Sequence, residues 1–365
     1  MAGTILVTGG AGFIGGCFIR QWLSTEPDSV INFDKLTYAG NLDSIRDALE
    51  DPRHQLIRAD ICDAAEVTQA LTSHRPRAIV HFAAESHVDR SIDGPEAFIQ
   101  TNIVGTFRLL QASLEYWRTL PTEEQDRFRF LYISTDEIHG SAAEGQFFDE
   151  ETVVAPNSPY SASKAAAGHL VQSYWTTYGL PVLETVCSNN YGPFQFPEKL
   201  IPLMILNAVE GKPLPMYGDG SQERDWLHVE DHCQALRCVL ERGRPGKRYS
   251  IGGDGPRTNR SVIERICQAV DDQCPDLPHR PSMTLIKSVT DRPGHDHRYA
   301  INSQRIRTEF GWQPRHDFES GLRATVQWYL ANAEWLERVT TGVYRRERLG
   351  LVSDEFSSEH DGVSE

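Results

Sequence analysis

The chain has 365 residues, of which 39% are hydrophobic and 24% are charged. This is the composition of a folded globular protein, and it excludes a collagen-like, coiled-coil or largely disordered chain. Asp and Glu (51) outnumber Lys and Arg (36), which gives a formal net charge of −15. We therefore expect no nucleic-acid partner, because binding to a polyanion depends on a basic surface.

The cysteines and the N-terminus indicate where the protein works. Seven cysteines are scattered without a Cys-x-x-Cys pair, which favours a reducing compartment over a disulfide framework. The N-terminus runs directly into a glycine-rich turn and shows no signal peptide. No apolar run approaches the roughly 20 residues that a membrane helix needs. We expect a cytoplasmic protein without a membrane contact.

Short apolar runs alternate with amphipathic segments in the first half of the chain. The predicted strands are Thr4–Val7, Val30–Phe33, Gln55–Ile57, Ala78–Phe82 and Phe130–Ser134. Helices are predicted over Ala64–His74, over Pro95–Trp117 and from Pro159 onward. This alternation predicts βαβ units, and therefore a Rossmann-like, doubly wound α/β fold with a parallel sheet.

The pattern changes after about Asn189, where proline and glycine become frequent. We expect two domains, a dinucleotide-binding domain over residues 1–188 that carries the catalytic residues, and a smaller, loop-rich substrate lobe over 189–350. Some segments of the second region are expected to return to the sheet. Residues 351–365 contain five acidic residues and no Lys or Arg, which predicts a disordered acidic tail.

A glycine-rich turn follows the first predicted strand and opens a helix. Gly9, Gly10, Gly12 and Gly15 fit the spacing that lets a backbone approach a pyrophosphate at a helix N-terminus. Asp34 ends the next strand, 19 residues after Gly15. A carboxylate there accepts hydrogen bonds from ribose hydroxyls and repels a 2′-phosphate, which favours NAD over NADP. Asp60 and Ile61 follow the third strand, at the edge where an adenine would lie.

Two further patterns carry chemistry. Tyr160 and Lys164 lie four residues apart, on one face of a predicted helix. The ammonium, together with a positively charged nicotinamide, is expected to bring the tyrosine pKa down toward the range of a working base. Asp136 and Glu137 end the fifth strand, at the sheet edge where ligands bind. They are either turn formers and caps or a general acid and general base with separated pKa values.

Several motifs together resemble one family. They are Gly-Gly-Ala-Gly-Phe-Ile-Gly at 9–15, Ala-Glu-Ser-His-Val-Asp-Arg at 84–90, Ser-Thr-Asp-Glu at 134–137, Tyr-Ser-Ala-Ser-Lys at 160–164 and Cys-Ser-Asn-Asn-Tyr-Gly-Pro at 187–193. This set is similar to the nucleotide-sugar 4,6-dehydratases of the extended short-chain dehydrogenase/reductase superfamily. Motifs at 196–202, 224–226 and 291–296 extend the likeness, which covers about residues 3 to 335.

The resemblance implies a reaction in which NAD⁺ oxidises C4 of a nucleotide-linked glucose, water leaves across C5 and C6, and hydride returns to C6. It gives Tyr160 as the base for the C4 hydroxyl, Glu137 as the base for the C5 proton and Asp136 as the acid for the C6 hydroxyl. Thr135 would hydrogen-bond the C4 oxygen, and Lys164 would also hold the nicotinamide ribose. The expected product of dTDP-glucose is dTDP-4-keto-6-deoxy-glucose.

The resemblance also implies the binding residues. The expected cofactor residues are Gly9, Gly12, Phe13, Ile14, Gly15, Asp34, Lys35, Asp60, Ile61, Ala83, Ser86, Thr101, Tyr160, Lys164 and Asn190. The expected substrate residues are Ser86, Thr135, Asn189, Lys199, Leu200, Pro215, Tyr217, Arg224, Asn259, Arg292 and His295. Arg224 and Arg292 also make sense independently, because a diphosphate needs cationic, forked donors within an acidic protein.

Three positions depart from the family pattern. His139 stands where a tyrosine is usual, and Val186 stands where an asparagine is usual and is expected to loosen the hydrogen bonding of the site. Gly168 stands where an aspartate is usual, and is expected to weaken its helix by about 1 kcal/mol. UDP-glucose remains an alternative substrate. Two alternative functions remain: a C4 epimerase or decarboxylase of the same superfamily, and a module that binds NAD or a nucleotide sugar without turnover. An epimerase, however, needs no acid–base pair at 136–137.

We expect no metal, since no ligand spacing in the sequence is convincing. We also expect a homodimer, with contacts near Pro95–Trp117 and Ser158–Tyr178.

Overall fold

The computed structural model describes residues 3–253 and 255–340 of the chain. The predicted acidic tail at 351–365 lies outside the described residues.

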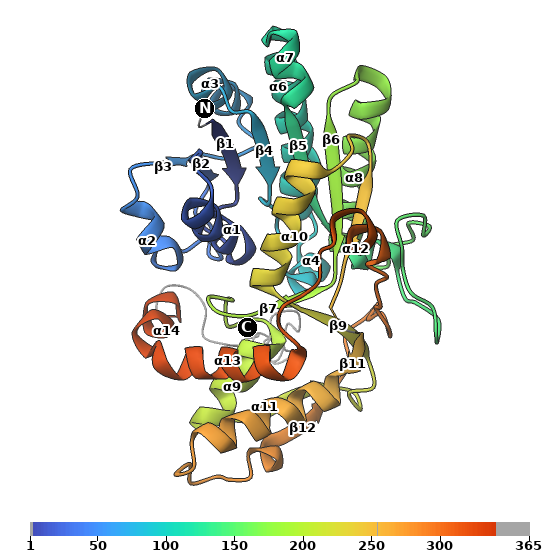
Figure 1. Ribbon diagram of the computed structural model, residues 1–365. Coiled ribbons are helices and arrows are strands. Elements are labelled where there is room, and N and C mark those ends of the chain that lie inside the picture. Colours follow the sequence, from blue (N-terminus) through green and yellow to red (C-terminus); the bar gives the residue numbers. More distant parts are fainter. Residues whose placement is uncertain (1–2, 254, 341–365) are drawn as a thin grey trace, which may run out of the picture.

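A parallel sheet of seven strands forms the centre of the larger domain (Figure 1). Its strand order is β10-β6-β5-β4-β1-β2-β3, and all of its pairs are parallel. The strands are β1 (Thr4–Thr8), β2 (Ser29–Asp34), β3 (His54–Arg58), β4 (Ala78–His81), β5 (Arg129–Thr135), β6 (Val182–Cys187) and β10 (Arg248–Ile251). The predicted doubly wound fold is confirmed, and each of the five predicted strands is present within one or two residues of its expected bounds.

Helices cover both faces of this sheet because its strands bury side chains on both sides. Along β1, Ile5 and Val7 pack in one apolar cluster, and Leu6 packs in the other. The first face is covered by α1 (Phe13–Thr25), α10 (Val229–Arg242) and α12 (Gln304–Phe310). The second is covered by α3 (Ala64–His74), α6 (Thr106–Thr119) and α8 (Pro159–Tyr178). Near-continuous apolar strands are typical of parallel sheets that are buried on both faces.

The helix ends follow from local sequence. The N-terminus of α8 is a capping box in which Ser158 and Ser161 satisfy each other's backbone N–H groups, and Pro159 takes the first helical position. The helix predicted over Pro95–Trp117 is present as three joined segments, α5 (Glu96–Phe98), a wider π-helical stretch (Ile99–Gly105) and α6. Shorter helices are α2 (Arg46–Leu49), α4 (Val88–Asp93) and α7 (Thr122–Arg127).

The second lobe lies below the carboxyl ends of the central strands in Figure 1. Its helices are α9 (Leu200–Glu210), α11 (Asn259–Gln273), α13 (Phe318–Ala331) and α14 (Ala333–Thr340). One small sheet has the order β11-β9-β7, with β7 (Asn189–Tyr191), β9 (Glu223–His228) and β11 (Pro256–Thr258), and the other pairs β8 (Leu214–Tyr217) with β12 (Ile286–Val289). A separate apolar cluster holds this lobe together.

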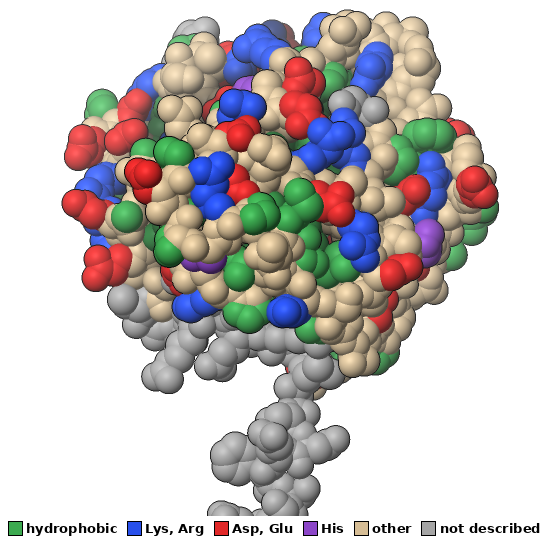
Figure 2. Space-filling view, turned by 90° about the horizontal axis from the view of Figure 1, so that it is seen from below, with side chains coloured by type: hydrophobic (Ala, Val, Ile, Leu, Met, Phe, Trp, Pro, Cys, Tyr) green, Lys and Arg blue, Asp and Glu red, His purple; other side chains and the backbone are tan. Residues whose placement is uncertain are grey.

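Chain segments cross between the two regions. β10 adds to the central sheet beside β6, and α10 packs against α1. On the face of the second lobe that Figure 2 shows, acidic and basic side chains are interspersed around a small apolar group. Within the described residues, no helix combines the length and the apolar character that a membrane crossing needs.

Candidate active site

The glycine-rich turn between β1 and α1 packs so closely that it excludes side chains. Gly9 has a φ of +71°, and a Cβ there would lie 2.6 Å from the backbone nitrogen of Ala83. A Cβ on Gly15 would lie 2.3 Å from the Gly9 carbonyl oxygen. Gly12 is the N-cap of α1, and no side chain caps this helix. The first N–H groups of α1 are therefore available to an anion.

Asp34 is held beside this turn. Its carboxylate accepts hydrogen bonds from the backbone N–H groups of Ala11 at 2.9 Å and Leu36 at 2.7 Å. Burial raises the pKa of Asp34, although both N–H groups oppose the shift. Further along the same edge, the Lys35 ammonium lies 2.6 Å from an Asp60 carboxylate oxygen. Asp34, expected to contact ribose, and Asp60 and Ile61, expected near the adenine, line the same cavity.

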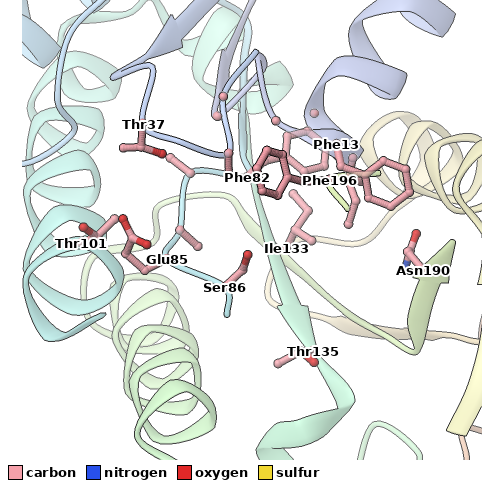
Figure 3. Close-up of a pocket in the computed structure, with 18 of the residues that line it drawn as sticks. Phe13, Thr37, Phe82, Glu85, Ser86, Thr101, Ile133, Thr135, Asn190 and Phe196 are labelled. Atoms are coloured by element: carbon pink, nitrogen blue, oxygen red, sulfur yellow. The ribbon is translucent and has the colours of Figure 1, made fainter. Parts of the chain in front are cut away.

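A cavity of about 320 Å³ extends from the glycine turn to the ends of β5 and β6. All fifteen residues predicted for the cofactor line it. In Figure 3, Ile133 and Thr135 lie along β5, with Ser86 on one side and Asn190 on the other. Residues that sequence reasoning missed also line it, namely Thr37, Glu85, Gln195, Phe196 and Glu198. The cavity suits a dinucleotide, because it combines a turn without side chains, a helix N-terminus without a side-chain cap and a carboxylate fixed by two backbone N–H groups.

Tyr160 and Lys164 lie one turn apart on α8, as predicted, and both are buried. Burial, together with the nearby Glu137, raises the pKa of Tyr160 well above its usual value. The Lys164 ammonium donates a hydrogen bond to the Ile133 carbonyl oxygen at 2.7 Å, and burial lowers its pKa to about 8. The expected lowering of the tyrosine pKa includes the charge of a bound nicotinamide, and it stays a prediction.

Asp136 and Glu137 experience different surroundings. Asp136 is 1% exposed and lines neither cavity, and one of its carboxylate oxygens has no hydrogen-bond partner. Burial, with Glu137 close by, raises its pKa well above the usual value. Burial also raises the pKa of Glu137, but Arg292, Arg224 and Lys199 oppose that shift. The pair is therefore divided into a carboxyl that favours its proton and a carboxylate facing three cations.

A second cavity of about 250 Å³ meets the first at Ser86, Glu137, Asn189, Glu198 and Lys199. Thr135 lines the first cavity, and the other predicted substrate residues all line the second.

Two arginines, one buried and one partly buried, supply positive charge to the second cavity. Arg224 is 5% exposed, and it donates to the carbonyl oxygens of Glu223 at 2.7 Å and Asp296 at 2.8 Å. Arg292 donates to an Asp89 carboxylate oxygen at 2.6 Å. The burial of Arg224 favours a binding role over a surface ion pair, because a buried cation requires compensating negative charge.

Comparison with known proteins identifies the family. A family model described as GDP-mannose 4,6 dehydratase matches residues 6–325. A dTDP-glucose 4,6-dehydratase of Xanthomonas campestris pv. campestris (strain B100) is 54% identical over 349 residues, which cover 96% of this chain and 99% of the relative. The chain belongs to the dTDP-glucose 4,6-dehydratase family.

Solved structures of the dTDP-glucose 4,6-dehydratase family share the fold. The protein from Bacillus anthracis str. Ames, solved in complex with NAD, has a TM-score of 0.82 and 44% identity, and the match covers 93% of this chain and all of the other, 100%. The protein from Streptomyces venezuelae, with NAD and TYD bound, has a TM-score of 0.84 and 42% identity. The match covers 92% of this chain and 99% of the other.

The three departures from the usual dTDP-glucose 4,6-dehydratase pattern lie outside both cavities. The His139 ring stacks near Phe148, with centroids 5.0 Å apart, and its Nδ1 lies 3.1 Å from the Val153 carbonyl oxygen. Val186 packs in an apolar cluster between Ser134 and Ser250 on the neighbouring strands, and the hydroxyls of both serines are buried without a partner.

The third departure has a local reason. A Cβ on Gly168 would lie 2.6 Å from a carboxylate oxygen of Glu184, so the adjacent strand fills the space that a side chain would need. Glu184 is itself 3% exposed, and its other carboxylate oxygen accepts from Arg248 at 3.0 Å.

Proposed function

We propose that the protein dehydrates dTDP-glucose to dTDP-4-keto-6-deoxy-glucose in an NAD-dependent reaction. The observation that carries this proposal is the Asp136–Glu137 pair at the end of β5, where the two cavities meet. A 4-epimerase needs no acid and base for removal of a C6 hydroxyl, so a carboxyl pair with separated proton affinities favours dehydration. NAD bound in the first cavity would supply the acceptor for oxidation at C4 and the donor for reduction at C6.

Tyr160 is assigned as the base that takes the C4 hydroxyl proton. Its pKa is high in the protein alone, so this step requires added positive charge beside the phenol. Lys164, one helical turn away, is positioned to hold the nicotinamide ribose and to contribute such charge. Thr135 lines the cavity beside Tyr160 and is assigned a hydrogen bond to the C4 oxygen.

Glu137 is assigned the removal of the C5 proton, which becomes acidic once C4 is a ketone. Three cations favour its ionised form, as a base requires. Asp136 is assigned the protonation of the departing C6 hydroxyl, because its buried carboxyl retains a proton to pH values well above the usual range. Its position behind the cavity wall means that the Asp136 side chain must turn toward the sugar to act.

The second cavity is assigned to the nucleotide diphosphate. Arg224 and Arg292 provide forked donors for phosphate oxygens, and an Asn189 side-chain oxygen is buried there without a partner. Lys199 donates to the Ser86 carbonyl oxygen at 3.0 Å, which ties the second lobe to the loop after β4. We assign a preference for dTDP over UDP from the family, with UDP-glucose as the alternative.

The test is incubation of the protein with NAD and either dTDP-glucose or UDP-glucose, followed by mass measurement. We expect the loss of one water from dTDP-glucose and a slower or absent loss from UDP-glucose. In D₂O the product should carry one solvent deuterium at C5, and a deuterium label at C4 of the substrate should end at C6. A product of unchanged mass would favour epimerisation. Loss of the C4 label to solvent would contradict the return of the C4 hydride to C6.

We further propose a homodimer that pairs the helical layer of α6 and α8. Tyr174 on α8 donates to Gln111 on α6 at 3.0 Å, and large apolar side chains are exposed along this layer at Phe107 (37%), Trp175 (36%) and Tyr178 (46%). Light scattering should give twice the chain mass, and Phe107→Glu should reduce it to one chain mass.

A cytoplasmic location is proposed because all seven cysteines are free thiols.

A further inference from the structure

Three residues that are distant in sequence come together at the end of β9. His228 is the last residue of β9, Glu230 lies in the first turn of α10, and His316 lies between α12 and α13. One potential ligand atom from each residue lies within 4.8 Å of the others. None of the three lines either of the two cavities.

His228 has an unused ring nitrogen in the interior. The residue is 4% exposed, and its Nδ1 is buried without a hydrogen-bond partner. Its Nε2 edge faces Gly192, where a Cβ would lie 3.2 Å from that nitrogen. Leaving a buried nitrogen without a partner is costly, and a bound metal ion would provide one.

His316 is held in the orientation typical of a metal ligand. Its Nδ1 and its backbone N–H both lie 3.0 Å from one carboxylate oxygen of Asp231, a residue that is 1% exposed. An Nδ1–H donated to a buried carboxylate leaves the Nε2 lone pair free, and this second contact is what orients histidines at metal centres. That Nε2 lies 3.9 Å from a carboxylate oxygen of Glu230.

We propose that His228, Glu230 and His316 form a binding site for a divalent transition metal ion, with Zn²⁺ as the preferred probe. Two imidazoles and a carboxylate are a donor set that Zn²⁺ accepts, with a water molecule in the fourth position. Tetrahedral bonds of about 2.0–2.1 Å would place the ligand atoms about 3.3 Å apart. The Glu230 side chain is 52% exposed, so it can rotate to shorten its distances from the two rings.

The proposed ion would have a structural role. It would join the end of β9, whose other end carries Arg224, to the segment that leads into α13. An ion that binds only the folded chain raises its stability in proportion to the logarithm of its concentration above the dissociation constant. The same contacts without an ion would form a stacked histidine pair, with ring centroids 4.1 Å apart, beside the acidic first turn of α10.

The test uses the full chain, stripped with a chelator and then dialysed against a small excess of ZnCl₂. We expect one Zn²⁺ per chain by elemental analysis and a rise of a few degrees in Tm. Glu230→Gln, at an exposed position, and His316→Gln should each lose both the bound ion and the Zn²⁺-dependent rise. His169→Gln, which changes an exposed histidine of α8, is the matched control and should retain both. For each variant, the Tm with Zn²⁺ is compared with the Tm without it, because His316→Gln also loses the Asp231 contact and can lower the Tm for that reason alone.

Co²⁺ distinguishes this site from the free thiols of the chain. Bound at the proposed site, Co²⁺ should give the visible bands of a tetrahedral nitrogen–oxygen set without the near-ultraviolet absorption of a thiolate ligand. The proposal is overturned by a protein that binds no Zn²⁺, by Zn²⁺ binding that survives both Glu230→Gln and His316→Gln, or by a thiolate spectrum that those variants leave unchanged.

Discussion

Arg292 donates to one carboxylate oxygen of Asp89 at 2.6 Å, and the Tyr217 hydroxyl donates to the other at 3.0 Å. Asp89 comes from α4, beside the central sheet, whereas its two partners come from the second lobe. Although burial opposes the shift, Arg292 lowers the pKa of Asp89. One carboxylate therefore fixes two side chains of the second cavity and joins the two parts of the site.

Asp89→Asn should weaken substrate binding more than it slows turnover. The amide cannot neutralise Arg292, and losing one partner of a buried charged hydrogen bond costs about 1–3 kcal/mol. We expect KM for dTDP-glucose to rise about tenfold, with kcat falling less than threefold. Steady-state kinetics checks this split, with Asp93→Asn at the exposed end of α4 as the control. A fall in kcat alone would show that Asp89 does not act through binding.

Glu137→Gln and Asp136→Asn should separate the steps of the reaction. Without the carboxylate of Glu137, the C5 proton remains, so we expect oxidation at C4 to continue while dehydration falls at least 100-fold. Rapid quench and mass analysis should find a 4-keto sugar that retains its C6 oxygen. Asp136→Asn should still exchange C5 hydrogen with D₂O but lose water slowly. Normal dehydration by Glu137→Gln would remove that residue from the proposed role.

The dependence of activity on pH should show one limb for each of the two carboxyl groups, at low pH for Glu137 and at high pH for Asp136. In the proposed mechanism Glu137 is ionised, so activity should fall as the pH drops through its raised pKa. Asp136 is protonated in that mechanism, so activity should also fall as the pH rises through its pKa, which burial raises well above the usual value. Arg292 opposes the rise at Glu137. Arg292→Gln should therefore move the acid limb of kcat/KM to higher pH, and an unmoved limb would assign it to another group.

Much of the cofactor cavity could be predicted from sequence because its residues follow strand ends. Parallel strands meet with their carboxyl ends at one edge, so the glycine turn after β1, Asp34 at the end of β2 and Thr135 at the end of β5 converge. The alternation of short apolar runs with helices was sufficient to place these strand ends, whereas many other residues of the cavity were implied only by the family resemblance. Helix interruptions such as the π segment at Ile99–Gly105 were missed because amphipathic periodicity continues through them.

Other features depend on contacts between distant segments. Glu198, which lines both cavities, and Tyr299, whose ring lies 4.2 Å below the Arg224 guanidinium, carry no local signal of a site. Spacing alone also gives no measure of the burial that raises the pKa of Tyr160 in the protein without a cofactor. The His228–Glu230–His316 cluster was missed because His316 is distant in sequence from the other two residues. It reaches them only through the packing of the two lobes.

Gly168→Ala should destabilise the protein, although alanine is the better helix former. Relief of the glycine penalty would add about 1 kcal/mol, but the new methyl group would lie 2.6 Å from Glu184, which Arg248 holds. Overpacking costs about 1–3 kcal/mol, so we expect a net loss of about 1 kcal/mol in urea unfolding. In a Glu184→Ala background, Gly168→Ala should raise the free energy of unfolding. Ala162→Gly, at an exposed position of α8, measures the difference in helix propensity between alanine and glycine alone. A stabilising Gly168→Ala in the unmodified chain would show that Glu184 moves aside at no cost.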